Sequence, residues 1–166
     1  MRKENFRSTS ERKLIKPAVD LVLLNIRSRF NVGAMFRTAD AVGISRIYLL
    51  GYTPRPPHKE IDKVALGAEK TVPFSSHATP LLYLKNLKKR GYSLVALETG
   101  RKTIKYFDYK RPKKKIALIV GHEVSGIDPK ILKLCDAIIS IPMRGRKKSL
   151  NVGIAVGIVA YRIAFP

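Results

Sequence analysis

The sequence predicts a single α/β domain in which helices cover both faces of a parallel sheet. Two observations carry this prediction. Short aliphatic runs such as 20–25 and 115–120 alternate with segments of helical periodicity, and such alternation requires crossover connections between parallel strands. A length of 166 residues, with 45% hydrophobic and 27% charged residues, suits one globular domain. We expect a basic N-terminal tail over 1–17 and the folded domain over 18–166.

The expected elements follow from local pattern. Val32, Met35, Phe36, Ala39 and Val42 recur at helical spacing before Gly43, which can end a helix. The segment 54–57 is rich in proline, which has no amide donor and a fixed φ, and it is therefore predicted to be a loop. Further strands are predicted at 46–50, 71–74, 92–97 and 137–141, and further helices at 60–68, 78–90 and 150–164. The apolar stripe of the helix predicted over 78–90 consists of Leu81, Leu82, Leu84 and Leu87.

The last predicted helix is apolar on nearly every side, since Arg162 is its only charged residue. Such a helix must be buried on most faces. Gly153, Gly157, Ala160 and Ala164 form one stripe of small residues that permits close approach of another backbone. Two interpretations remain open: an ordinary core helix, or a contact between subunits.

Composition narrows the functional classes. Thirty-three Lys and Arg against 12 Asp and Glu give a net charge of +21, which favours a polyanionic partner such as nucleic acid. No apolar run reaches the ~18 residues of a membrane span, and residues 1–16 lack the apolar core of a signal peptide. Cys135 is the only cysteine, which excludes internal disulfides and fits the cytoplasm.

The basic residues gather in the tail and at 85–90, 111–115 and 144–148. Such positions can contact phosphates, although any one cluster is equally well explained as a solubilising surface. The basic residues expected to contact the nucleic acid are Arg27, Arg29, Arg144, Arg146, Lys147 and Lys148.

Several common site signatures are missing. No G-x-G-x-x-G follows the first strand, and no G-x-S-x-G is present. His58, His77 and His122 are scattered without a second ligand at useful spacing, so no metal site is expected.

Three polar segments remain, at 25–39, 119–128 and 141–153, each after a predicted strand, where α/β sheets bind ligands. Taken singly, each has an ordinary structural explanation. Asn31 and Ser149 could cap helices, Arg37 could pair with Asp40, and Glu123 could be a loop carboxylate.

Together, in this order and spacing, the three segments resemble the signature motifs of the SpoU/TrmH family of RNA ribose methyltransferases, in the SPOUT superfamily. The segment 63–74 also resembles the family's middle region, and the resemblance covers roughly 18–164. Gly153 departs from the pattern, because many relatives have a small hydroxyl residue there. This departure bears on helix packing more than on chemistry.

The resemblance implies a C-terminal deep trefoil knot, a homodimer with sites at the subunit interface, and S-adenosylmethionine as cofactor. It implies that the cofactor is held near Leu97, Glu98, Thr99, Gly121, Ile141, Met143 and Leu150. It places the polar catalytic and binding positions at Arg37, Asn31, Glu123, Ser149 and Asn151.

The implied reaction is attack of a ribose 2′-oxygen on the methyl group of a sulfonium, for which alignment and removal of one proton are the main tasks. The resemblance makes Arg37 the acceptor or relay of that proton. A guanidinium stays charged at ordinary pH, so stabilisation of the developing alkoxide is an equally open role.

Two rival functions remain: a non-catalytic RNA-binding or ribosome-assembly protein with this fold, and a methyltransferase that acts on a base. Many relatives have an RNA-recruiting domain before the knot, and the short segment before residue 18 is too small for one. On that basis tRNA is favoured over rRNA as the substrate.

Overall fold

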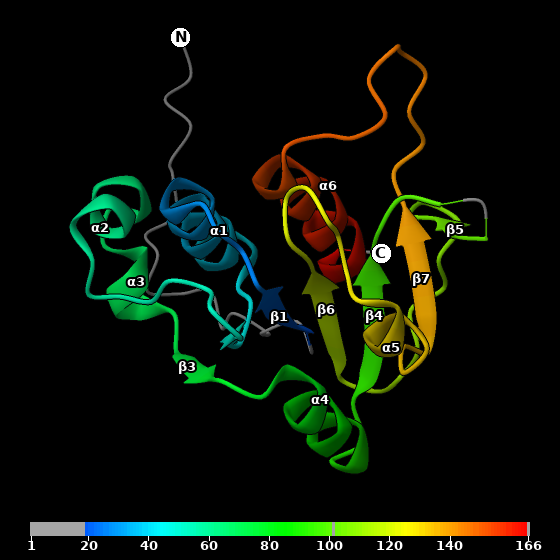
Figure 1. Cartoon of the computed structure of the whole chain (residues 1–166), viewed down its shortest axis with the longest axis horizontal. Helices are drawn as coiled ribbons and strands as arrows, with labels where there is room; N and C mark the ends of the chain where they lie inside the picture. The colour runs from blue at the N-terminus through cyan, green and yellow to red at the C-terminus, as the bar shows by residue number, and fades with distance from the viewer. Residues whose placement is uncertain (1–18, 101, 166) are drawn as a thin grey trace, which may run out of the picture.

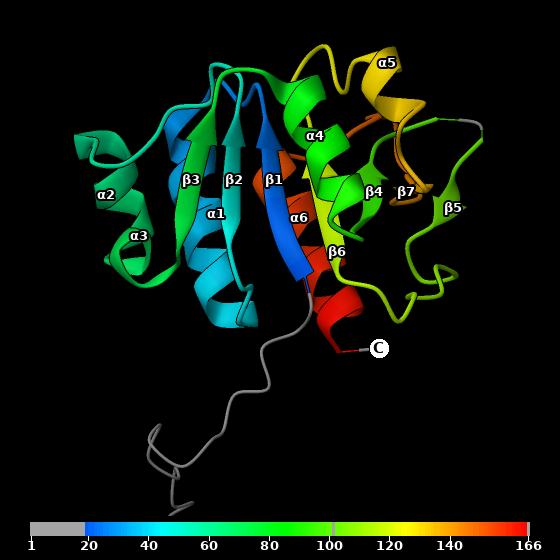
Figure 2. The ribbon, with the colours of Figure 1, turned by 90° about the horizontal axis from the view of Figure 1, so that it is seen from below.

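The computed structural model describes residues 19–100 and 102–165, and within them seven parallel strands form one sheet (Figures 1 and 2). The strands lie in the order β3 (Phe74–His77), β2 (Ile47–Leu50), β1 (Val19–Leu24), β6 (Ile116–Val120), β4 (Ser93–Leu97), β7 (Ala137–Ser140) and β5 (Ile104–Lys105). The predicted parallel α/β fold is confirmed. The predicted tail over 1–17 lies outside the described residues.

Helices cover both faces, as Figure 2 shows. One face carries α1 (Arg29–Val42), α2 (Lys59–Ala65), α3 (Ala68–Thr71) and α6 (Val152–Ala164); the other carries α4 (Pro80–Lys89) and α5 (Pro129–Leu132). Each face has its own apolar core, so the central strands β1 and β6 are buried along their whole length. This is why they are almost entirely aliphatic.

Some predicted boundaries were wrong. The strand predicted at 71–74 begins only at Phe74, because Thr71 still belongs to α3 and the Val72 amide donates to the Ala68 carbonyl. The helix predicted over 60–68 is divided at Leu66, which has a φ of +53°. Leu82, which was predicted to belong to the apolar stripe of α4, is exposed. Strand β5 and helix α5 were not predicted, since both are only two to four residues long.

The C-terminal segment decides the position of the site. After β7 the chain runs back across the carboxyl ends of the strands and enters α6, which packs against α1 and β6 near the middle of the sheet (Figure 1). This return path is consistent with the expected knot, which stays a prediction. Among the described residues, no helix combines the length and the apolar character that crossing a membrane requires.

In this single chain α6 is only partly buried. Val156, Val159 and Ile163 lie in the core, whereas Ile154 and Tyr161 are 58% and 48% exposed. The expectation that most faces of this helix are covered is therefore not met within one chain. The alternative, a contact between subunits, stays a prediction.

Candidate active site

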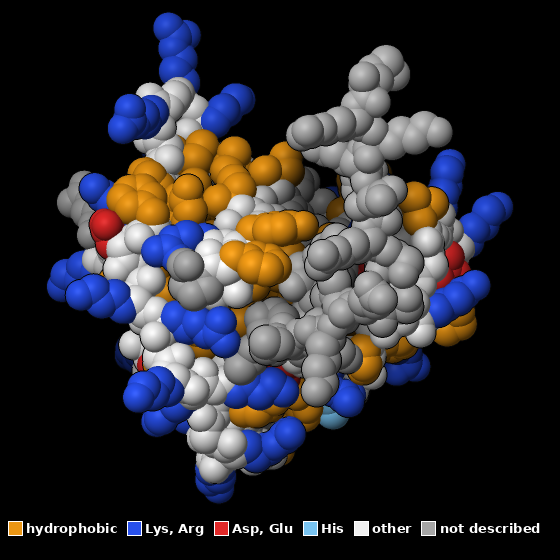
Figure 3. Space-filling view, turned by 180° about the vertical axis from the view of Figure 1, so that it is seen from behind, with side chains coloured by type: hydrophobic (Ala, Val, Ile, Leu, Met, Phe, Trp, Pro, Cys, Tyr) orange, Lys and Arg blue, Asp and Glu red, His pale blue; other side chains and the backbone are white. Residues whose placement is uncertain are grey.

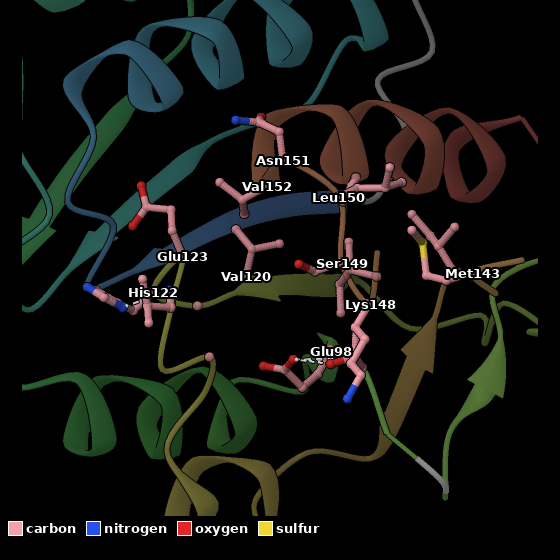
Figure 4. A pocket seen from close by; sticks show the side chains of 17 residues that line it. Glu98, Val120, His122, Glu123, Met143, Lys148, Ser149, Leu150, Asn151 and Val152 are labelled. Carbon is pink, nitrogen blue, oxygen red and sulfur yellow. Dashed lines mark hydrogen bonds between the residues drawn. The ribbon is translucent and has the colours of Figure 1, made fainter. Parts of the chain in front are cut away.

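A cavity of about 370 Å³ lies where β4, β6 and β7 end (Figure 4). Its walls come from the ends of β4 and β6, from the loop after β6, from residues just after β7, and from the segment that leads into the first turn of α6. The lining residues are Leu97, Glu98, Thr99, Val120, Gly121, His122, Glu123, Val124, Gly126, Ile141, Met143, Lys148, Ser149, Leu150, Asn151, Val152 and Ala155.

All seven residues expected to hold the cofactor line this cavity, although they come from four separate stretches of chain. The sequence did not predict six of the lining residues, which are Val120, His122, Val124, Gly126, Val152 and Ala155. Lys148, which was predicted to bind RNA, also lines the cavity. His122 and Gly126 lie within the second motif and could have been identified by their position next to Gly121 and Glu123.

Glycine is required on one wall by close packing. A Cβ atom at Gly121 would lie 2.6 Å from the Gly126 carbonyl oxygen and 2.6 Å from Cγ1 of Ile127. Gly126 has a φ of +69°, and a Cβ there would collide with the carboxylate of Glu98. That carboxylate accepts the main-chain N–H groups of Ile127 at 3.0 Å and Thr99 at 2.8 Å. Glu98 therefore fixes this wall.

Glu123 joins the second motif to the first. Its Oε2 accepts the main-chain N–H of Arg27 at 3.0 Å. Its Oε1 accepts the N–H of Ser28 and the side-chain amide of Asn31, both at 3.0 Å. Burial alone would raise the pKa of Glu123, but these hydrogen bonds favour the carboxylate and lower the pKa below its ordinary value.

The third motif joins the same network through two asparagines. Nδ2 of Asn151 donates to Oδ1 of Asn31 at 3.0 Å. Oδ1 of Asn151 accepts the N–H groups of Gly153 and Ile154 and so caps α6. Asn31 is only 5% exposed. One chain of hydrogen bonds thus connects residues 92 and 120 positions apart in sequence.

The helix-cap alternatives are corrected by these contacts. Ser28, not Asn31, caps α1, and its side chain accepts the Asn31 N–H at 3.2 Å. Asn151, not Ser149, caps α6. Ser149 is exposed and lines the cavity, and within the described part of the chain its hydroxyl has no hydrogen-bond partner.

Arg37 lies apart from the cavity. It is exposed on α1 and is not among the lining residues. The alternative pairing of Arg37 with Asp40 is not observed, and Asp40 instead accepts the hydroxyl of Thr71 at 2.8 Å. Within residues 19–100 and 102–165, the side chain of Arg37 forms no ion pair or hydrogen bond.

The predicted RNA-contacting residues are all exposed. Arg29 pairs with Glu60 at 3.6 Å, which offsets part of its charge at the surface. Arg144, Arg146 and Lys147 lie on the loop between β7 and α6, next to the cavity. In the view from behind, Lys and Arg side chains are spread over the part of the surface that is not drawn in grey (Figure 3).

The cavity has the size and the mixed lining of a small-molecule site. Leu97 and Ile141 provide apolar walls, as do Met143 and Leu150, and Glu98 provides a carboxylate (Figure 4). A volume of about 370 Å³ lies within the usual range for a ligand of this size. The described residues contain no group of three or more His, Cys, Asp or Glu side chains that could hold a metal ion.

The parallel sheet and the cavity at its carboxyl edge define an α/β protein with a small-molecule site made by four separate stretches of chain. The model of the SpoU rRNA methylase family matches residues 18–161. The chain belongs to this family, and the predicted resemblance is confirmed.

Similar proteins include a tRNA (guanosine(18)-2′-O)-methyltransferase of Aquifex aeolicus, 33% identical over 89% of this chain and 70% of its own length. A 23S rRNA (guanosine-2′-O-)-methyltransferase RlmB of Ralstonia nicotianae is 32% identical over 87% of this chain and 57% of its own length. The chain thus spans less than two thirds of some of the relatives it matches.

Solved structures confirm the fold. The AdoMet-bound rRNA methyltransferase from Sinorhizobium meliloti aligns with a TM-score of 0.83 at 28% identity and covers 87% of this chain and 55% of its own. A structure that gives insight into 2-OH methylation of C/U34 on tRNA aligns with a TM-score of 0.77 at 26% identity. It covers 87% of this chain and 93% of its own.

Proposed function

We propose that the protein transfers the methyl group of S-adenosylmethionine to a ribose 2′-hydroxyl of RNA. The observation that carries this proposal is the cavity itself: all seven expected cofactor residues line it, and two further lining residues, Glu123 and Asn151, are hydrogen-bonded to Asn31 of the first polar segment. When bound, S-adenosylmethionine supplies an electrophilic methyl group on a sulfonium. Relatives named as ribose 2′-O-methyltransferases support the same reaction.

The residues of this chain have distinct roles in the proposal. Glu123, Asn31 and Asn151 are joined by hydrogen bonds and act as positioning residues that hold the β6 loop against α1 and α6. Ser149 offers a hydroxyl inside the cavity, where it can hold the ribose or the cofactor. The apolar walls limit water near the reacting atoms, which strengthens electrostatic interactions there.

Arg37 enters the reaction from a second subunit in this proposal. Arg37 is exposed and does not line the cavity of its own chain, and α6, which packs against α1, leaves Ile154 and Tyr161 exposed. A homodimer that buries this face could bring Arg37 to the partner's cavity. There the guanidinium would bind a phosphate or stabilise the developing alkoxide, or relay the hydroxyl proton.

The subunit exchange can be tested by mixing inactive variants. Arg37→Ala and Ser149→Ala homodimers should each be inactive. Random exchange between them should restore about a quarter of the sites if Arg37 serves the partner, because half the dimers are mixed and each holds one intact site. If Arg37 served its own chain, the mixture would stay inactive.

A tRNA substrate is the preferred version of the proposal. The Aquifex relative acts on tRNA, and the neighbour matched over 93% of its length concerns tRNA as well. We place the reaction in the cytoplasm, in accord with an RNA substrate and a single cysteine.

The decisive experiment measures transfer of labelled methyl from S-adenosylmethionine to tRNA and to rRNA, with Arg37→Ala as the control. Mass analysis of the digested RNA then distinguishes a methylated ribose from a methylated base. Absence of both cofactor binding and transfer would support the non-catalytic RNA-binding alternative. Base methylation would overturn the ribose assignment alone.

A further inference from the structure

Tyr52 is an exposed aromatic residue beside the cavity, and the proposed mechanism does not use it. It follows β2 by two positions, and its side chain is 60% exposed. Its ring lies edge to face with the imidazole of His122, with centroids 6.3 Å apart and planes at 73°. His122 lines the cavity on the same side as Glu123 (Figure 4). Tyr52 therefore contacts a residue that lines the cavity.

The backbone on both sides of Tyr52 is tightly held. Gly51 has a φ of +69°, and a side chain there would collide with Oδ1 of Asn25. The same oxygen accepts the Tyr52 N–H at 3.3 Å. The hydroxyl of buried Thr53 lies 2.9 Å from the carbonyls of Leu23 and Leu50 and accepts the Ile26 N–H at 3.1 Å. A rigid loop presents an aromatic ring at little ordering cost upon binding.

Three loops meet around this ring and supply polar groups of complementary kinds. The loop 25–28 carries Arg27, which is exposed while its N–H is held by Glu123. In His122, Nδ1 accepts the N–H groups of Val124 and Ser125 at 3.1 Å, so the proton of the neutral ring lies on Nε2. Among the described residues Nε2 has no hydrogen-bond partner. An aromatic face, a cation and a free N–H donor together suit one unstacked nucleotide.

We propose that Tyr52 stacks on an unpaired nucleobase of the RNA substrate at the entrance to the cavity. The proposal rests on the proposed function, because it assumes that RNA approaches from the side of His122 and Glu123. Stacking on a tyrosine is tolerant of base identity, since every base has an aromatic face. Tyr52 is then a recognition residue that holds the target strand in an unpaired form close to the reacting ribose.

Three variants test the stacking directly. Tyr52→Ala should weaken tRNA binding roughly five- to a hundredfold, the range found when a stacking aromatic is removed, with no change in affinity for S-adenosylmethionine. Tyr52→Phe should retain binding, because it keeps the ring. Phe107→Ala removes another exposed aromatic, which does not line the cavity, and should leave binding unchanged. Affinity is measured by fluorescence anisotropy with labelled tRNA.

A second readout does not depend on methyl transfer. A short single-stranded RNA that contains 2-aminopurine should lose fluorescence on binding the unmodified protein and Tyr52→Phe, but keep its fluorescence with Tyr52→Ala. Equal tRNA affinity of Tyr52→Ala and the unmodified protein would overturn the stacking proposal, as would equal losses in Tyr52→Ala and Tyr52→Phe. Tyr52-dependent quenching without any methyl transfer would instead refute the proposed activity and leave the stacking intact.

Discussion

Substitution of Glu123 by glutamine tests whether the hydrogen-bond network holds the site together. The carboxylate accepts three N–H groups, from Arg27, Ser28 and the side chain of Asn31. A glutamine side chain of nearly the same shape has one accepting oxygen and one donating NH2 group. In its better orientation it keeps the two bonds made by Oε1 and turns an N–H donor toward the Arg27 N–H.

The expected destabilisation follows from this count. One hydrogen bond to a charged acceptor contributes about 1.5–3 kcal/mol, and the partial exposure of Glu123 reduces this to about 1–2 kcal/mol. For a chain of this size the melting temperature should fall by roughly 2–8 °C. The rate of methyl transfer should also fall, because the Asn31–Asn151 pair and the start of α6 are no longer held in place by the carboxylate of Glu123.

The pH dependence of this effect has a definite sign. The pKa of Glu123 is lower in the folded protein than its ordinary value of 4.5. A carboxyl of this kind stabilises the fold above its unfolded-state pKa, and that contribution is lost as the pH falls. The difference in stability between the unmodified protein and Glu123→Gln should thus be complete at pH 7 and shrink below pH 4.5.

Urea denaturation at several pH values measures this difference. Asp108→Asn is the matched control, since it removes the same charge from an exposed carboxylate that forms no hydrogen bond or ion pair within the described residues. A Glu123→Gln variant as stable as Asp108→Asn at pH 7 would refute the anchoring role. So would a stability difference that stays constant from pH 7 to pH 3.5.

Two further predictions concern the cavity and the basic loop. Gly121→Ala should weaken the binding of S-adenosylmethionine at least tenfold, as measured by calorimetry, because the added Cβ would collide with the backbone of Gly126. The control is Gly145→Ala, whose added Cβ would have no atom within 4 Å, so this variant should bind the cofactor normally. Equal affinities of the two variants would show that the glycine wall does not shape the site. Neutralising Arg146, Lys147 and Lys148 should weaken RNA binding and flatten its dependence on salt, by about 0.7–0.9 in slope for each phosphate that the protein no longer neutralises. Because Lys148 also lines the cavity, the double variant that neutralises Arg146 and Lys147 is the cleaner test. Its control is a double variant that neutralises Lys85 and Lys89 on α4. An unchanged salt slope would assign the loop to a merely solvated surface.

Much of the fold could be predicted because burial leaves a direct pattern in the sequence. Strands β1 and β6 are covered on both faces, so their residues are continuously aliphatic. The spacing of Val32, Met35, Phe36 and Ala39 predicted α1, and Gly43 ends it with a φ of +79°. The error at 71–74 arose because α3 is a single turn, too short to show a helical period.

The chemical types in the site were also present in the sequence, but their connections were not. Pattern alone left Asn31 and Ser149 as plausible helix caps, and only the structure assigned capping to Ser28 and Asn151. Tyr52 carried no signal at all, since a tyrosine after a strand has no special meaning until its ring is placed against His122.

The sequence by itself determined the fold class, the family resemblance and most of the residues that line the cavity, because each depends on local periodicity or on motif order. Only the tertiary structure decided which groups are engaged and which are free. Hydrogen bonds join Asn31 to Glu123 and to Asn151, which lie 92 and 120 positions away in the sequence. Ser149 and Tyr52 remain open to a ligand, and Arg37 does not line the cavity of its own chain. Hydrogen bonds depend on distance in space, and the distance between remote segments is set by how the sheet and its covering helices pack together.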